Sequence, residues 1–250
     1  MWEIKQSATP KTVDIYIYSA VESDSEDWWT GEKIASETSA NTFRDKLAEI
    51  KDIDNINIYI NSLGGSVMEG VAIYNQLKRH KAQKTVYVDG FACSIASVIA
   101  MAGDKVVMPK NTVMMIHNAW TYCRGNASEL RKMADDLDKI NEVGKQAYLD
   151  KTNGKITAEE LTALMDSETY LTAEECVKYG FADEYSEYNA DIERAKSMLE
   201  EAQKTNVKQY CDKLTKICAI ADKATIPQAN TFKEEAIKKI NKIFGGNIND

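Results

Sequence analysis

Ser94 is a residue whose type and neighbouring sequence would suit acyl transfer. It lies in the run Gly90-Phe-Ala-Cys-Ser-Ile-Ala96, after a β-branched stretch and before small apolar residues. A serine at a strand-to-helix turn has its hydroxyl at a helix N-terminus, where free N–H groups and the dipole favour developing negative charge. Ser94 is therefore a candidate nucleophile. The alternative is that it caps a core helix, and the run does not match the Gly-x-Ser-x-Gly elbow.

A histidine ends the most apolar strand pattern in the chain. Residues 112–117, Thr-Val-Met-Met-Ile-His, read as a buried strand that ends at His117. Ligands of open α/β sheets bind at the carboxyl ends of the strands. The other histidine, His80, lies in a basic helix end where a cation complements the helix dipole. His117 is therefore the candidate base.

Two adjacent glycines follow another predicted strand. Gly64 and Gly65 come after Ile56 to Ile60, within Asn61-Ser-Leu-Gly-Gly-Ser66. Glycines at a strand end allow backbone N–H groups to point outward, as an oxyanion hole requires. The same pair would also suit a plain turn.

The elements that must position these residues alternate between strand and helix patterns, which predicts an α/β fold. Strands are expected at Val13–Tyr18, Ile56–Ile60, Thr85–Val88, Lys105–Met108 and Thr112–His117, and helices at Ser39–Asp52, Val67–His80, Gly125–Asp150, Thr157–Met165 and Thr172–Tyr179. Asp89-Gly90 is expected to end its strand in a sharp turn. Residues 22–31 are expected to form an acidic loop held to the body by the indoles of Trp28 and Trp29.

Length and composition indicate one main domain with an appendage. The chain has 250 residues, 44% of them hydrophobic, enough for one sizeable core. We expect a domain over residues 1–186 and a charged helical tail over residues 187–250. The net charge of −8, without a basic cluster, argues against nucleic acid and anionic membranes as partners.

The first residues lack a signal-peptide pattern, and the apolar run after Ser94 is too short to cross a bilayer, so a cytoplasmic protein is expected. The five cysteines are scattered, no Cys-x-x-Cys pair occurs, and only two histidines are present. We therefore expect free thiols, no metal site and no cofactor. Cys93, beside Ser94, is interpreted as a small buried residue rather than a nucleophile.

Taken together, the glycine pair, Ser94 and His117 supply the oxyanion donors, nucleophile and base of a serine hydrolase. The sequence resembles the Clp protease proteolytic subunit family over roughly Val13 to Tyr185. The motifs that carry the resemblance are Tyr59-Ile-Asn-Ser-Leu-Gly-Gly65, Gly90-Phe-Ala-Cys-Ser-Ile-Ala96, Met114-Met-Ile-His117 and Leu171-Thr-Ala-Glu-Glu-Cys-Val-Lys-Tyr-Gly-Phe-Ala-Asp183.

The resemblance implies a crotonase-like spiral of β-α-β units with a long handle helix, Gly125 to Asp150, that joins subunits in a homo-oligomeric ring, heptameric or double. It implies Ser94 as nucleophile, His117 as base, and the N–H groups of Ile95 and of the Gly64-Gly65 turn as the oxyanion hole. The family's acid, usually aspartate, falls on Glu168 here, and Asp166 is a rival. Leu63 replaces the family's usual proline.

Within this family the chain looks most like the phage and prophage head maturation proteases, judging by Trp28-Trp29, Arg79-His-Lys-Ala82, Met108-Pro109 and Glu168-Thr-Tyr-Leu-Thr-Ala173. That branch implies peptide bond cleavage in capsid or scaffold proteins, in the host cytoplasm or prohead. The alternatives are a housekeeping degradation subunit that works with an unfoldase, and a catalytically silent structural pseudoprotease. The segment before the first predicted strand lacks much of the N-terminal region that forms the pore loops of the housekeeping enzymes. This argues against an unfoldase partner. An acyl-CoA hydratase or isomerase would need no paired serine and histidine.

Overall fold

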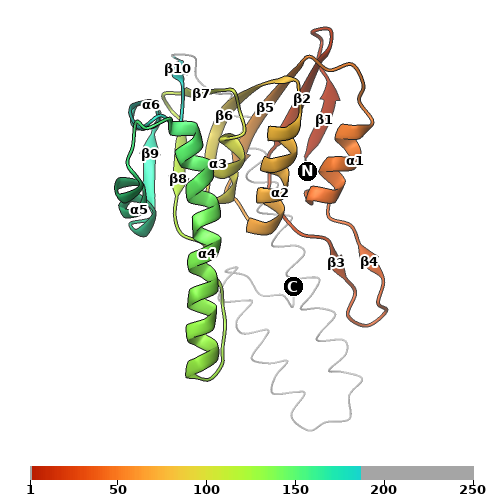
Figure 1. Ribbon diagram of the computed structural model, residues 1–250. Helices are drawn as coiled ribbons and strands as arrows, with labels where there is room; N and C mark the ends of the chain where they lie inside the picture. The colour runs from red at the N-terminus through yellow and green to blue at the C-terminus, as the bar shows by residue number, and fades with distance from the viewer. Residues whose placement is uncertain (1, 187–250) are drawn as a thin grey trace, which may run out of the picture. The chain divides into compact units, whose positions relative to one another are not determined.

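Strands from both ends of the described chain combine into one mostly parallel sheet (Figure 1). The computed structural model describes residues 2–186, so the predicted helical tail at 187–250 lies outside it. The sheet has the strand order β1-β2-β5-β6-β7-β10, and β8 and β9 join it through β6. Its pairs are parallel except β1 with β2 and β8 with β9. The strands are β1 (Glu3–Gln6), β2 (Thr12–Ile17), β5 (Asn55–Ser62), β6 (Gln83–Cys93), β7 (Lys105–Pro109), β8 (Val113–Ile116), β9 (Thr169–Thr172) and β10 (Glu184–Ser186).

Helices connect these strands as the sequence predicts, so the expected α/β class is confirmed. The helices are α1 (Ala40–Ala48), α2 (Val67–Arg79), α3 (Ile95–Ala100), α4 (Ala127–Thr152), α5 (Ala158–Asp166) and α6 (Ala173–Tyr179). Helices α1, α2 and α3 each connect two adjacent parallel strands, which gives three consecutive β-α-β units. Figure 1 shows these helices in front of the sheet. The predicted capping box of Thr172 and Glu175 begins α6.

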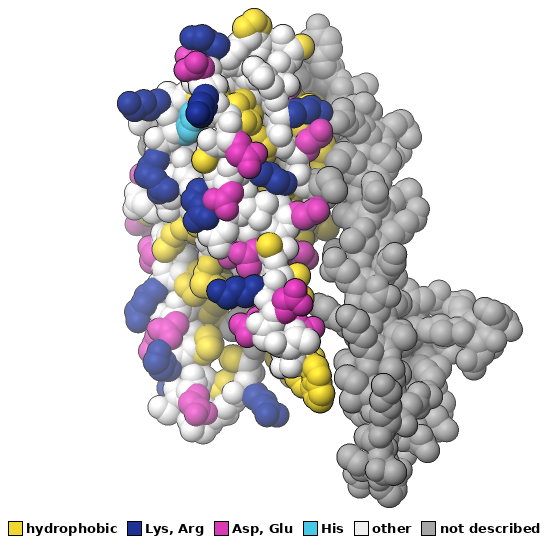
Figure 2. All heavy atoms as spheres, turned by 90° about the vertical axis from the view of Figure 1, so that its right-hand side faces the viewer, with side chains coloured by type: hydrophobic (Ala, Val, Ile, Leu, Met, Phe, Trp, Pro, Cys, Tyr) yellow, Lys and Arg dark blue, Asp and Glu magenta, His cyan; other side chains and the backbone are white. Residues whose placement is uncertain are grey.

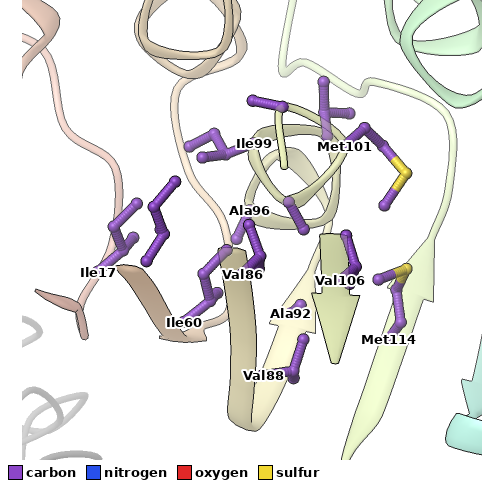
Figure 3. Packing of buried hydrophobic residues seen from close by; sticks show 14 of the residues in the cluster. Ile17, Ile60, Val86, Val88, Ala92, Ala96, Ile99, Met101, Val106 and Met114 are labelled. Carbon is purple, nitrogen blue, oxygen red and sulfur yellow. The ribbon is translucent and has the colours of Figure 1, made fainter. Parts of the chain in front are cut away.

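Strict alternation along the central strands places aliphatic side chains on the helix-covered face. Ile56, Ile58 and Ile60 of β5 are fully buried, and residues from α3 pack against β6, β7 and β8 in the same cluster (Figure 3). The opposite face carries a tyrosine ladder, in which the Tyr59 ring stacks at 4.8 Å on Tyr16 and at 5.2 Å on Tyr87. The core therefore lies directly beneath the short helix that follows Ser94.

Strand β6 does not end at Asp89-Gly90, so the predicted sharp turn is wrong. The strand continues to Cys93 and changes partner on the way. Residues 85–87 pair with β7, whereas residues 91–93 pair with β8. Because the second half has a strand partner of its own, its backbone groups remain hydrogen-bonded and Gly90 is tolerated within the strand. This extension places Ser94 at the end of a central strand.

The acidic segment before α1 forms a small hairpin rather than a loop held by its indoles. Strands β3 (Ser25–Glu26) and β4 (Lys33–Ile34) pair antiparallel. Trp28 and Trp29 are each 78% exposed and pack edge to face on one another at 5.4 Å. The Asp27 carboxylate accepts hydrogen bonds from the N–H groups of Trp29 and Thr30, which closes the turn locally. The predicted packing of both indoles on the body is therefore wrong.

The N-terminal half of α4 extends past the end of the sheet (Figure 1). The apolar residues Leu130, Met133, Ile140 and Val143 of α4 are between 38% and 47% exposed, whereas Ala147 and Tyr148, nearer its C-terminal end, are buried. No helix in residues 2–186 is long and apolar enough to cross a bilayer. On the face shown in Figure 2, acidic and basic side chains are interspersed.

Candidate active site

Ser94 lies at the junction of β6 and α3 in an unusual backbone conformation. Its φ is +54° and its ψ is −130°, a region that costs a non-glycine residue about 1–3 kcal/mol. Its N–H donates to the Met115 carbonyl at 2.8 Å, which ties the junction to β8. The Ser94 side chain makes no capping hydrogen bond to α3. Ser94 is therefore the N-cap residue of α3 by position, as the alternative interpretation expected, but its hydroxyl does not cap the helix and is available to another partner.

That partner is His117, which directly follows β8. The Ser94 hydroxyl lies 2.7 Å from His117 Nε2, within hydrogen-bond range. The contact follows from the sheet, because Cys93 of β6 is in register with Met115 of β8 and the two side chains extend from adjacent strand ends. The His117 side chain is only 9% exposed. A neutral imidazole with its proton on Nδ1 would accept the serine proton at Nε2.

Glu168 lies on the Nδ1 side of His117. Its Oε1 is 4.0 Å from Nδ1, which is too long for a hydrogen bond, and the glutamate side chain is 73% exposed. Glu168 has a φ of +47° immediately before β9, and β9 pairs with β8 so that Thr169 is opposite Ile116. The strand pairing thus brings this glutamate close to the histidine.

Asp166, the rival acid, is engaged elsewhere. It is the last residue of α5, and its Oδ1 accepts a hydrogen bond of 2.7 Å from Asn118 Nδ2. Asn118 follows His117 in the chain, so Asp166 holds the loop beyond the histidine rather than the imidazole. The geometry thus separates the two carboxylates that the sequence could not distinguish.

The two glycines of the turn after β5 make different contacts. The Gly64 N–H donates to Ser62 Oγ at 3.1 Å, so it is used within the turn. A Cβ at Gly64 would lie 2.7 Å from the Ser94 Cβ, which means that the missing side chain is what allows the turn to contact the serine. Gly64 therefore provides space beside the hydroxyl.

Gly65 forms a parallel bridge with Val21, in which Val21 N–H donates to Gly64 O and Ser66 N–H donates to Val21 O. In a parallel bridge these neighbouring groups make both hydrogen bonds, so the N–H of Gly65 points away from Val21. The Ile95 N–H begins α3, where the first amides have no partner within the helix. Gly65 and Ile95 are therefore the better pair of oxyanion donors.

The other reactive residues considered from the sequence lie outside this arrangement. Cys93 is 2% exposed, and burial raises the pKa of its thiol to about 11, so it is a buried neutral thiol as predicted. His80 ends α2, and its Nδ1 accepts the N–H of Ala82. Burial, followed by the charge of Lys84, lowers the pKa of His80.

Sequence reasoning missed a pair of hydroxyls next to the site. Ser97 Oγ lies 2.5 Å from the Ser94 carbonyl oxygen and 2.7 Å from the Tyr148 hydroxyl oxygen. A signal was present, since a serine three residues after Ser94 can reach back to its carbonyl. Tyr148 gave no such signal, because it fits the apolar spacing of its helix.

Comparison of the sequence with known proteins identifies its family. The sequence profile of the Clp protease family matches residues 16–189, well over half of the chain. The chain belongs to the Clp protease family. The ATP-dependent Clp protease proteolytic subunit of Deinococcus radiodurans is 34% identical over 132 residues, which cover 52% of this chain and 63% of that relative. The protein of the same name from Bacteroides fragilis is 32% identical over 153 residues, covering 58% of this chain and 72% of its own length.

Family membership supports a peptidase and agrees with the observed α/β architecture around a mostly parallel sheet. The matched region spans every residue of the candidate site, from the Gly64-Gly65 turn to Glu168. The Deinococcus match covers less than two thirds of that protein. What the relatives do as whole proteins is therefore considered below as a proposal.

Proposed function

We propose that this Clp protease-family chain is a serine endopeptidase with Ser94 as its nucleophile. The observation that carries the proposal is the 2.7 Å contact between Ser94 Oγ and His117 Nε2 at the strand ends. A nucleophile within hydrogen-bond reach of a base is the geometry that covalent catalysis requires. The hydroxyl also has no capping role to compete with catalysis.

In the proposed reaction, Ser94 Oγ attacks the scissile carbonyl carbon while its proton moves to His117 Nε2. The N–H groups of Gly65 and Ile95 stabilise the negative oxygen of the tetrahedral intermediate. Collapse of the intermediate breaks the C–N bond, and His117 gives its proton to the leaving amine. A water molecule, deprotonated by His117, then attacks the acyl carbon. The ester bond to Ser94 Oγ breaks, and His117 returns the proton to Ser94 as the acid product leaves. Glu168 stabilises the imidazolium through its charge.

The exposed apolar face of α4 supports assembly into a ring of identical subunits. Leu130, Met133, Leu137, Ile140 and Gly144 are spaced three and four residues apart along one side of the helix. Leu130, Met133 and Ile140 remain substantially exposed, although the same side of the helix is buried at Ala147. A second copy of the chain would cover this stripe. The helix would then join subunits, as the resemblance to the family's handle helix implies.

For the biological role we propose head maturation of a phage or prophage, with capsid or scaffold protein as substrate. The motifs that support this role are Trp28-Trp29, Met108-Pro109 and the segment from Glu168 to Ala173. The second candidate role is protein degradation with an ATP-dependent unfoldase. It is favoured by the names of the relatives, which are proteolytic subunits of ATP-dependent proteases.

Cleavage assays on the wild type and on Ser94→Ala test the proposed chemistry. The wild type should hydrolyse a fluorogenic peptide, and the variant should lose this activity while keeping its melting temperature and its oligomeric state. The fold should tolerate the change because the side chain makes no capping bond. Cleavage of a capsid or scaffold protein without ATP would favour maturation, whereas dependence on an unfoldase and ATP would favour degradation. A wild type without peptidase activity would indicate a pseudoprotease.

A further inference from the structure

Two buried hydroxyl groups connect helix α4 to the backbone of Ser94. Ser97 lies in the first turn of α3 and is 0% exposed, and Tyr148 lies near the C-terminal end of α4 and is 1% exposed. Their oxygens are 2.7 Å apart. The Tyr148 ring is held edge to face against Phe181 at 5.6 Å, so its hydroxyl has a fixed position.

The directions of these hydrogen bonds follow from the number of protons. Ser97 has one hydroxyl proton, and its shortest contact is the 2.5 Å bond to the Ser94 carbonyl oxygen, which can only accept. A longer contact of 3.3 Å reaches the Met115 carbonyl. Because the Ser97 proton is used in this way, the Tyr148 hydroxyl donates to Ser97. Burial raises the pKa of Tyr148, so it keeps its proton at neutral pH.

The carbonyl at the end of this chain shares a peptide group with one of the proposed oxyanion donors. The Ser94 C=O and the Ile95 N–H belong to a single planar unit and point in opposite directions. Whatever fixes the Ser94 oxygen therefore fixes the direction of the Ile95 N–H. The oxygen is held by the N–H of Ser97 at 2.9 Å and by its hydroxyl at 2.5 Å.

The strained backbone of Ser94 makes such an anchor necessary. Its φ of +54° and ψ of −130° are sparsely populated by non-glycine residues, and such conformations persist only where the surroundings hold them. Helix α3 has only six residues, so it supplies few hydrogen bonds of its own. The hydroxyl chain adds an anchor from α4, an element separate in the sequence.

We propose that Tyr148 is a positioning residue that acts through Ser97 to aim the Ile95 N–H into the oxyanion hole. The inference rests on the proposed function, since it assumes acyl transfer at Ser94. Tyr148 touches neither the substrate nor the reacting atoms. Its contribution is to the tetrahedral intermediate, where the oxyanion needs a correctly aimed donor, and not to binding of the substrate.

Tyr148→Phe tests this directly because it keeps the ring against Phe181 and removes only the hydroxyl. Losing a whole oxyanion donor costs about 10²–10³-fold in kcat. We expect the loss of its anchor to lower kcat by about 10-fold and to change KM less than 2-fold. A peptide aldehyde, which forms a tetrahedral adduct with the serine, should bind about 10-fold more weakly, whereas the product peptide should bind as to the wild type.

Two further variants make the result specific. Ser97→Ala breaks the same chain one step closer to Ser94, so it should lower kcat at least as much, and adding Tyr148→Phe to it should cost little more. Tyr179→Phe is the matched control, because Tyr179 also packs on Phe181, at 6.3 Å, but its hydroxyl donates to no group in the described residues. The control should keep the wild-type kcat and aldehyde affinity.

The outcomes separate this inference from the function on which it rests. Wild-type kcat and aldehyde affinity in Tyr148→Phe would overturn the inference and leave the peptidase intact. A loss of activity explained entirely by a smaller folded fraction, or by a raised KM, would also overturn it. A wild type that neither cleaves peptides nor binds the aldehyde would overturn the proposed function, and this inference with it.

Discussion

Glu168→Gln removes the negative charge that lies on the Nδ1 side of the proposed base, while keeping the side chain nearly the same size. The distance of 4.0 Å from Glu168 Oε1 to His117 Nδ1 sets the size of the expected effect. Two unit charges at this distance interact by about 1 kcal/mol in water and about 4 kcal/mol at an effective dielectric constant of about 20. Because the Glu168 carboxylate is 73% exposed, the interaction energy between the two charges should lie near the lower end of this range.

A change of roughly 1.4 kcal/mol in the activation free energy corresponds to a tenfold change in rate. We therefore expect Glu168→Gln to lower kcat/KM by about 10-fold. That is far less than the roughly 10⁴-fold loss known for a buried aspartate that hydrogen-bonds its histidine. Turnover of a small peptide ester, measured at low and high salt, checks this. The difference between the variant and the wild type should shrink at high salt, since an exposed charge is screened.

Asp166→Asn is the matched control, because this carboxylate binds Asn118 and not the histidine. It should change kcat/KM by less than about 2-fold. A large loss in Asp166→Asn with normal turnover in Glu168→Gln would refute the reasoning and reverse the assignment of the acid. Wild-type turnover in both variants would mean that Ser94 and His117 act as a dyad.

Two further predictions concern assembly and stability. The double substitution Leu137→Asp and Ile140→Asp in α4 should dissociate the assembly, which light scattering would measure. A wild type that is fully active as a monomer would contradict the proposed ring. Asp104→Asn should lower the free energy of unfolding by about 1–2 kcal/mol at pH 7, because the buried ammonium of Lys84 loses its carboxylate 3.2 Å away. Burial raises the pKa of Asp104, but hydrogen bonds from the N–H and the ammonium of Lys84 outweigh it and lower the pKa below its usual 3.8. The stabilisation is therefore present above about pH 4 and is lost as the pH falls through the folded-state pKa, so urea unfolding of the two proteins should converge at low pH. An equal difference at pH 7 and at pH 3 would contradict this assignment.

The sequence predicted the features that depend on local pattern. Period-two alternation in β5 gives the buried Ile56, Ile58 and Ile60, and a capping box at Thr172 begins α6. The proximity of Ser94 to His117 could also be predicted from the sequence, because the carboxyl ends of parallel strands meet at one edge of a sheet. These inferences need no knowledge of the exact strand pairing.

The features that sequence reasoning missed depend on long-range pairing. Gly90 was predicted to end its strand, but β8 provides a partner for the residues beyond it, and no local signal shows this. The short strands β1, β9 and β10 were missed because each is defined mainly by its neighbour. The different contacts of Gly64 and Gly65 depend on the bridge to Val21, more than 40 residues earlier in the sequence.

Labelling with a fluorophosphonate tests the central claim most directly, because this probe forms a covalent bond only with an activated serine. Intact mass spectrometry of the full chain should show a single adduct, and peptide mapping should place it on Ser94. The adduct should be absent from Ser94→Ala and should form far more slowly in His117→Ala, since the 2.7 Å contact to Nε2 is what activates the hydroxyl. An unlabelled wild type, or an adduct that persists in Ser94→Ala, would contradict the assignment of Ser94 as the nucleophile.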